Sequence, residues 1–276
     1  MAHWQPGDVE ANGLRLHYTR TGGAGPQIVL AHGFSDDGLC WTPLAEALAP
    51  DYDLIMVDAR GHGRSEAPAQ GYGPAEHAAD LAGAIVALGL RRPAVLGHSM
   101  GAATALALAG TYPEAARAIL LEDPPAWWVA TPETSAAAED RRAQMRQRII
   151  GLKGKTREEL LAAQHAETPG WSEAELGPWA DAKLRFNLNA LNFGPATSLD
   201  WPAILGGITV PALLITADPA RGAIVTDESA ASLQALVPQL RVARIADAGH
   251  SIRRDQFDRY LEIVRAFLRE AASSEF

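Results

Sequence analysis

The hydrophobic pattern of the first 124 residues is a series of short apolar runs separated by longer amphipathic stretches. Short, continuous apolar runs are typical of strands that are buried on both faces of a parallel sheet. Stretches whose apolar positions recur every three or four residues are typical of helices that cover such a sheet. The predicted strands are 14–19, 28–31, 54–57, 94–96 and 118–121, and the predicted helices are 41–49, 75–88 and 100–111. Because strand and helix alternate, the sequence predicts an α/β fold, a parallel sheet with helices on both faces.

The alternation of strand and helix stops near residue 124 and resumes near residue 211. Between these points the pattern is helical throughout, with predicted helices at 134–151, 156–167 and 172–191 and a turn near 196–203. Beyond it the pattern predicts strands at 211–215 and 241–245 and helices at 228–237 and 256–271. We therefore predict one core made of residues 1–124 and 203–276, with a helical cap, residues 125–202, inserted into it.

Composition and charge narrow the class of protein. The chain has 276 residues, of which 47% are hydrophobic and 21% charged, with a net charge of −9 and no basic stripe. We therefore expect no nucleic-acid partner and no membrane insertion, and no apolar run approaches the roughly 18 residues of a spanning helix. Cys40 is the only cysteine and no signal peptide is visible, so we expect a cytoplasmic protein. The oligomeric state is not indicated by the sequence.

The pentapeptide GHSMG, residues 97–101, lies where a predicted strand meets a predicted helix. One interpretation is a tight turn that needs small residues. The other is a nucleophile elbow, G-x-S-x-G, in which a strained turn exposes the hydroxyl of Ser99.

Two further polar segments follow predicted strands, and sites in open α/β sheets lie at the carboxyl ends of strands. His250 follows strand 241–245, and the sequence HGFS, residues 32–35, follows strand 28–31. A serine needs a base to become a good nucleophile, and histidine titrates in the right range. An oxyanion needs backbone N–H donors, for which Met100 and Phe34 are the natural candidates.

Taken in chain order, HGFS, DARGHGRS (residues 58–65), GHSMG and DAGHS (residues 247–251) resemble the motifs of the α/β-hydrolase fold family. The resemblance extends from about residue 10 to residue 271. It implies an eight-stranded, mostly parallel sheet with helices on both faces and a helical cap after the sixth strand. It also implies a catalytic triad in the chain order serine, acid, histidine.

The triad acid is the point at which this sequence departs from the family pattern. The family usually places the acid a few residues beyond the seventh strand, which corresponds here to a position near Ala220. Asp218 is the only carboxylate in that loop before Asp227, so we predict Asp218 as the acid. A minority of the family takes the acid from the end of the sixth strand, which makes Asp123 the alternative. Asp123 could equally be a structural residue at the strand end.

The substrate pocket is predicted from aromatic residues near these motifs. Trp127 and Trp128 stand at the entrance to the predicted cap, and His32, Leu39 and Trp41 lie in or beside the HGFS motif. Such residues can equally be packing residues or, for histidine, structural hydrogen-bonding groups. The sequence has no metal-binding histidine pair and no phosphate-binding glycine loop, so we expect neither a metal nor another cofactor.

These features predict a serine hydrolase that cleaves carboxylic esters of small apolar or aromatic molecules through an acyl-enzyme. The alternatives are a C–C bond hydrolase, a lactonase or a lyase-type synthase with the same triad. A slow-turnover ligand-binding protein on the same scaffold is the alternative from outside enzymology, because a fold does not determine a function.

Overall fold

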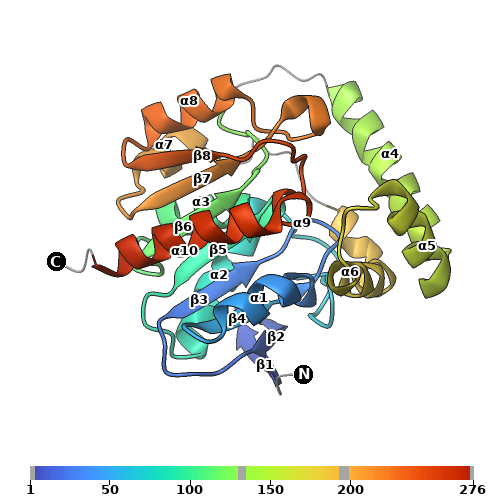
Figure 1. Cartoon of the computed structure of the whole chain (residues 1–276), viewed down its shortest axis with the longest axis horizontal. Helices are drawn as coiled ribbons and strands as arrows, with labels where there is room; N and C mark the ends of the chain where they lie inside the picture. Colours follow the sequence, from blue (N-terminus) through green and yellow to red (C-terminus); the bar gives the residue numbers. More distant parts are fainter. Residues whose placement is uncertain (1–3, 130–134, 193–198, 274–276) are drawn as a thin grey trace.

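The computed structural model describes residues 4–129, 135–192 and 199–273. In this part of the chain eight strands form one sheet in the order β1-β2-β4-β3-β5-β6-β7-β8 (Figure 1). The strands are β1 (Gln5–Ala11), β2 (Leu14–Arg20), β3 (Gln27–Ala31), β4 (Asp53–Val57), β5 (Ala94–His98), β6 (Ala118–Glu122), β7 (Ala212–Thr216) and β8 (Leu240–Arg244). β1 and β2 are antiparallel, whereas β3 to β8 run parallel. The prediction of a mostly parallel, eight-stranded sheet is confirmed.

The sheet separates two apolar layers, because neighbouring residues on a strand point to opposite faces. In β3, Val29 belongs to the apolar layer that also contains residues of α2, α3, α7 and α8, whereas Ile28 and Leu30 belong to the layer that contains residues of α1 and α10. Figure 1 shows α1 and α10 on the near side of the sheet. These helices are α1 (Thr42–Leu48), α2 (Pro74–Ala87), α3 (Met100–Thr111), α7 (Trp201–Gly206), α8 (Asp227–Leu236) and α10 (Phe257–Ser273). Both faces of the central strands are therefore dry, as their continuous apolar runs predict.

Short helices lie at the carboxyl ends of three strands. They are η1 (Gly38–Trp41) after β3, η4 (Pro219–Arg221) after β7 and α9 (Ile252–Asp255) after β8. They fix the loops that follow these strands at the edge of the sheet where the polar motifs gather.

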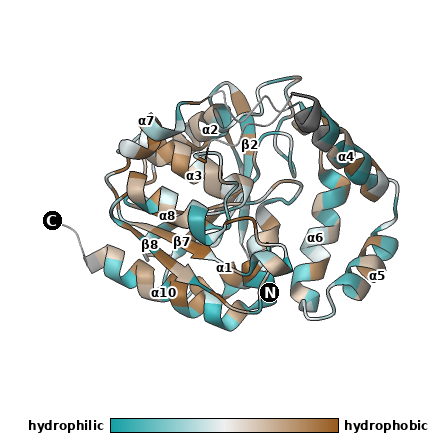
Figure 2. Cartoon of the chain, turned by 90° about the horizontal axis from the view of Figure 1, so that it is seen from above, coloured by the Kyte–Doolittle hydropathy of each residue, from teal (hydrophilic) through white to brown (hydrophobic). Residues whose placement is uncertain are grey.

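A group of helices separates β6 from β7. It comprises α4 (Ser135–Lys153), α5 (Arg157–Glu167), α6 (Glu173–Arg185) and η2 (Leu188–Leu191), followed by α7. Figures 1 and 2 both place α4 and α5 furthest from the sheet, with α6 between them and the core. In Figure 2 apolar residues gather on the strands, whereas α4, α5 and α6 carry many hydrophilic residues. Trp171, Trp179 and Leu160 form a small apolar cluster of their own within this group. The helix α7, by contrast, packs against the sheet through Trp201 and Leu205.

No helix in the three described segments is long and apolar enough to cross a membrane.

Candidate active site

Ser99 stands at the turn between β5 and α3 with φ 50° and ψ −112°. A positive φ is uncommon and strained for a residue with a side chain, and such strain gathers at functional sites. The turn is possible because glycines stand two residues before and two residues after Ser99. A Cβ on Gly97 would lie 2.2 Å from the carbonyl oxygen of Gly101, and a Cβ on Gly101 would lie 2.0 Å from that of Ala31. The two glycines thus let α3 start directly against β3 and β5, which is the backbone geometry of a nucleophile elbow.

Asp123 follows β6, directly beside the elbow. The backbone N–H of Ser99 donates to the carbonyl of Glu122 (2.8 Å), so the residues after β5 and β6 lie next to each other. Asp123 has φ 43° and its side chain is fully buried. Its carboxylate accepts the backbone N–H groups of Ile224 and Val225 (both 2.9 Å) and meets Nδ1 of His250 at 2.6 Å. Three donors therefore fix this carboxylate, and one of them is the imidazole.

Asp218 does not contact His250, which corrects the prediction that it is the partner of the histidine. Its carboxylate accepts the backbone N–H of Ala220 (2.9 Å) and so caps the start of η4. The loop after β7 contributes to the site in another way, through the N–H groups of Ile224 and Val225 that bind Asp123. The carboxylate that contacts His250 is that of Asp123, the alternative acid.

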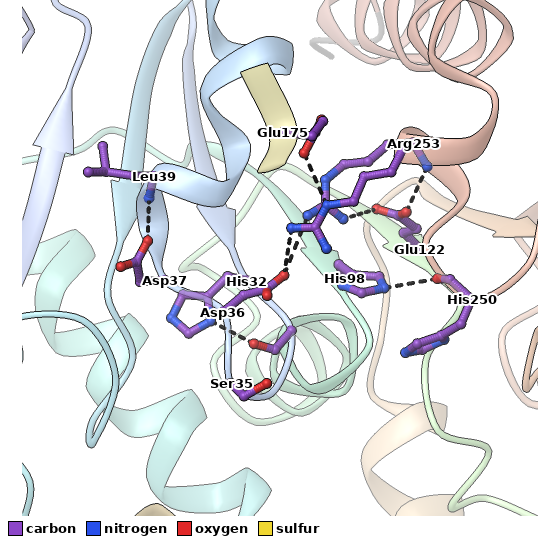
Figure 3. A network of polar contacts seen from close by, with 12 residues as sticks. His32, Ser35, Asp36, Asp37, Leu39, His98, Glu122, Glu175, His250 and Arg253 are labelled. Carbon is purple, nitrogen blue, oxygen red and sulfur yellow. Dashed lines mark hydrogen bonds and ion pairs between the residues drawn. The ribbon is translucent and has the colours of Figure 1, made fainter. Parts of the chain in front are cut away.

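His98, the residue before Ser99, holds the backbone of His250. Its Nε2 lies 3.0 Å from the carbonyl oxygen of His250, and the two rings lie 4.8 Å apart between centroids (Figure 3). Because a carbonyl only accepts, Nε2 of His98 carries the proton. Burial holds the pKa of His98 well below its usual range, so the ring is neutral. His98 therefore places the loop of His250 against the elbow that carries Ser99.

The peptide that joins Gly33 to Phe34 is held from its carbonyl side. The oxygen of Gly33 accepts the backbone N–H of Asp36 (3.1 Å) and Nδ1–H of His32 (2.8 Å). In a planar trans peptide the N–H points opposite to the C=O, so the N–H of Phe34 faces away from these two donors. Gly33 itself lies beside the elbow, since a Cβ there would be 3.5 Å from Cβ of Ser99.

His32 was predicted to line the substrate pocket. Instead it is buried and supports the loop of Gly33 and Phe34. It is 1% exposed, and its Nε2 accepts the backbone N–H of Ala59 (3.0 Å) while Nδ1–H donates to Gly33. Burial lowers its pKa. Both ring nitrogens are thus committed to the backbone, which makes His32 a structural hydrogen-bonding residue.

Two of the predicted pocket tryptophans are core residues. Trp41 is fully buried, and the guanidinium of Arg253 lies 4.1 Å from the centroid of its ring. Trp128 is buried against the sheet, and its indole N–H donates to the carbonyl of Ser229 (2.9 Å). Their large apolar surfaces stabilise the core instead of facing a ligand. Trp127 is half-buried against the ring of Trp201, and Leu39 is half-buried in η1.

Aromatic side chains cover the outer side of the loop that contains Phe34. The ring of Phe34 meets Phe186 edge-on at 5.1 Å and His62 at 5.6 Å between centroids. Burial holds the pKa of His62 well below its usual range, so it joins this cluster as a neutral ring. Phe186 follows α6 and packs with Tyr72 and Ile149. An apolar surface, made partly by the inserted helices, therefore borders the site.

A group of buried charges that no sequence pattern indicates lies behind the site (Figure 3). Glu122, which precedes Asp123, binds the backbone N–H and the guanidinium of Arg253 at 3.0 and 3.1 Å. Tyr260 donates to the same carboxylate (3.2 Å), and Asp36 lies 3.8 Å from Arg253. Buried charges of this kind need partners with good geometry. Hydrophobic patterning could not reveal them, because each looks like a surface residue in the sequence.

Asp37, in the loop after Phe34, makes stability depend on pH. Burial and the charge of Asp58 raise the pKa of Asp37 to about 7, although Arg185, whose Nε lies 3.0 Å from Oδ2 of Asp37, lowers it in part. Since the unfolded carboxyl titrates near 3.9, the folded state holds the proton more tightly. The stabilisation by this proton is complete below about pH 4 and is lost as the pH rises toward 7.

We expect the Asp37→Asn variant to be insensitive to this effect, because an asparagine oxygen still accepts the N–H of Leu39 but carries no charge. Between pH 5 and pH 8 the wild type should lose about 3 kcal/mol of unfolding free energy relative to the variant. Denaturant unfolding of both proteins at the two pH values measures this difference. An equal change in both proteins would contradict the assignment.

No group of three or more histidine, cysteine, aspartate or glutamate side chains that could hold a metal ion occurs in residues 4–129, 135–192 and 199–273.

The chain belongs to the alpha/beta hydrolase fold family, whose sequence profile matches residues 26–253. N-formylmaleamate deformylase of Pseudomonas putida is 30% identical to it over 275 residues, covering 95% of this chain and 96% of that protein. The crystal structure of an N-formylmaleamic acid deformylase from Pseudomonas putida has a TM-score of 0.77 at 24% identity, covering 94% of this chain and all of that one. The enol-lactonase from Burkholderia xenovorans has a TM-score of 0.73 at 25% identity, covering 95% of this chain and 100% of that chain.

Proposed function

We propose that this protein is a serine hydrolase that uses Ser99, His250 and Asp123 to break an activated acyl bond of a small molecule. The observation that carries the proposal is the 2.6 Å contact between Nδ1 of His250 and the buried carboxylate of Asp123, directly beside the strained elbow of Ser99. Serine, histidine and acid then follow the roles of a catalytic triad.

In the proposed reaction, Nε2 of His250 takes the proton of Ser99, and Oγ attacks the carbonyl carbon of the substrate. Asp123 keeps the proton of the imidazole on Nδ1 and stabilises the imidazolium that forms. The oxyanion is bound by the N–H groups of Met100, at the start of α3, and of Phe34. His250 then gives its proton to the leaving nitrogen or oxygen, and a water activated by the same histidine releases the acyl group from Ser99.

The bond that is broken is proposed to be a lactone or an N-acyl bond instead of a simple carboxylic ester. The names of the similar proteins support this alternative, since one is a deformylase and another an enol-lactonase. Both reactions use an acyl-enzyme and a leaving group that His250 can protonate, so the triad needs no change. Neither of these two proteins is named as a carboxylesterase.

Three probes test the bond class: p-nitrophenyl acetate, the aryl lactone dihydrocoumarin and N-formylmaleamate. We expect kcat/KM for the lactone or the N-formyl compound to exceed that for the ester by at least about tenfold, after correction for the rate without enzyme. The Ser99→Ala variant serves as the control for every probe. The highest kcat/KM on the ester would restore the carboxylesterase interpretation, and ligand-dependent stabilisation without turnover would favour a binding protein.

A further inference from the structure

Lys183 on α6 reaches across from the inserted helices to the loop that follows Phe34. Its Nζ donates to the carbonyl of Ser35 (2.9 Å) and to Oδ1 of Asp36 (2.7 Å). The side chains of Lys183 and Asp36 are only 6% and 5% exposed. Ser35 has φ 63°, so the loop is strained at the residue whose carbonyl Lys183 binds.

Asp36, which Lys183 binds, is in turn hydrogen-bonded to the peptide that joins Gly33 to Phe34. The backbone N–H of Asp36 donates to the carbonyl of Gly33 (3.1 Å), which sets the direction of the N–H of Phe34. A chain of contacts thus runs from Lys183 through Asp36 and Gly33 to a proposed oxyanion donor. An oxyanion donor must be placed to within a few tenths of an ångström, so small displacements of this loop matter for the rate.

The same helix also holds the loop that carries His250. Oδ2 of Asp36 accepts Nη2 of Arg254 (2.9 Å), and Nε of Arg254 donates to Glu175 on α6 (3.0 Å). Arg254 lies in α9, which directly follows the His250 loop. In Figure 3 the guanidinium groups next to the Arg253 label lie between the carboxylates of Glu175 and Asp36.

A second contact to the His250 loop comes from the segment before α6. The indole N–H of Trp171 donates to Oδ1 of Asp255 (3.0 Å), and Oδ2 of Asp255 accepts the backbone N–H of Gly249 (2.8 Å). Gly249 is the residue before His250. Residues 171–183 therefore contact the loop of Phe34 directly and the loop of His250 through Arg254 and Asp255 of α9.

The charges in this group balance. Lys183 and Arg254 face Asp36 and Glu175, and all four side chains are at most 6% exposed. Burial alone would raise the pKa of Asp36, but Arg254 and Lys183 hold it well below its usual range. A buried, balanced group of this kind contributes little net stability but fixes a geometry, because each partner left alone would be a buried, unpaired charge.

We propose that α6 is a positioning element of the active site and that Lys183 is a positioning residue, which fixes the N–H of Phe34 through Ser35 and Asp36. This inference rests on the proposed function. Besides covering the site, α6 would then help to position a donor that stabilises the oxyanion of the transition state.

The test uses Lys183→Met, which keeps the length of the side chain but removes the charge and both hydrogen bonds. Turnover is measured with p-nitrophenyl acetate, and active sites are counted by intact mass after saturation with a fluorophosphonate. We expect one adduct per chain, formed more slowly than in wild type. We expect kcat per labelled site to fall about 10- to 100-fold, with KM within threefold, because the oxyanion exists only in the transition state.

Two further variants separate positioning from folding. Lys183→Met combined with Asp36→Asn leaves Arg254 paired with Glu175 and no uncompensated buried charge, so it should fold well while kcat per labelled site stays low. The control, Arg157→Met, removes the exposed ion pair with Asp181 on the outer side of the same helix. Its kcat per labelled site should lie within twofold of wild type.

A wild-type value of kcat per labelled site in both Lys183 variants would overturn the inference, even if fewer sites were labelled, because Lys183 would then only support folding. That outcome leaves the proposed function intact. A wild-type protein that neither reacts with the fluorophosphonate nor turns over the ester would instead remove the proposed function, and this inference with it.

Discussion

Replacing Asp123 with asparagine is expected to lower kcat by roughly 10³- to 10⁴-fold, whereas Asp218→Asn should change it less than twofold. In Asp123→Asn, one oxygen can still accept the N–H of Val225, which it now binds at 2.9 Å. The amide NH₂ then faces Nδ1 of His250, where the carboxylate oxygen now accepts the hydrogen bond from Nδ1–H. The imidazole would have to carry its proton on Nε2 and could no longer accept the proton of Ser99.

The Asp218→Asn variant is the matched control because it makes the same chemical change in the neighbouring loop. Asparagine caps a helix start as well as aspartate does, so the contact with the N–H of Ala220 is kept. Steady-state kinetics of both variants, with circular dichroism to confirm folding, make the comparison. Loss of turnover in Asp218→Asn with retention in Asp123→Asn would contradict the geometry described above.

Ser99→Ala is expected to lower turnover by about 10⁴-fold or more. The variant loses the only atom that can form the acyl-enzyme, while the oxyanion donors and His250 stay in place. Alanine is no bulkier than serine, so the elbow with φ 50° should keep its shape. Unchanged thermal unfolding together with lost turnover is the expected result. A variant that retained more than about a tenth of wild-type kcat would exclude Ser99 as the nucleophile.

The central strands and the helices that cover them could be predicted because their apolar runs report burial directly. The strand β1 was missed, since Gln5–Ala11 is half-exposed and contains Pro6 and Gly7. The pair Asn12-Gly13 indicates the turn, because an Asn-Gly pair between two strands is typical of a β-hairpin. In the structure these residues have φ values of 51° and 74°, as such a turn requires. The predicted cap boundaries, residues 125 and 202, stay predictions.

The triad acid could not be placed from sequence, because its position depends on backbone conformation. Asp123 reaches His250 from a left-handed backbone, φ 43°, which no sequence pattern indicates for an aspartate after a strand. Asp218, in the loop where the family usually carries its acid, instead caps a helical turn. The order of the motifs therefore predicts both loops, and in the structure the loop after β6, not the loop after β7, supplies the carboxylate that contacts His250.

The sequence also does not indicate which polar and aromatic side chains are buried. The sequence predicts Trp41 and Trp128 as pocket residues, and packing residues are the alternative. The structure shows both in the apolar core, where η1 and the segment after β6 pack against the sheet. Asp36 lies 147 residues before Lys183 and 218 residues before Arg254, and the three side chains meet only in the folded chain. A pattern of single residues cannot report such a meeting.

The most direct measurement of the central claim, that Ser99 is a nucleophile activated by His250 and Asp123, is mass spectrometry after treatment with a fluorophosphonate. We predict one adduct per wild-type chain, located on Ser99 by peptide mapping. We also predict no adduct in Ser99→Ala and much slower labelling in Asp123→Asn than in Asp218→Asn. An unlabelled wild type, or an adduct on another residue, would contradict the claim.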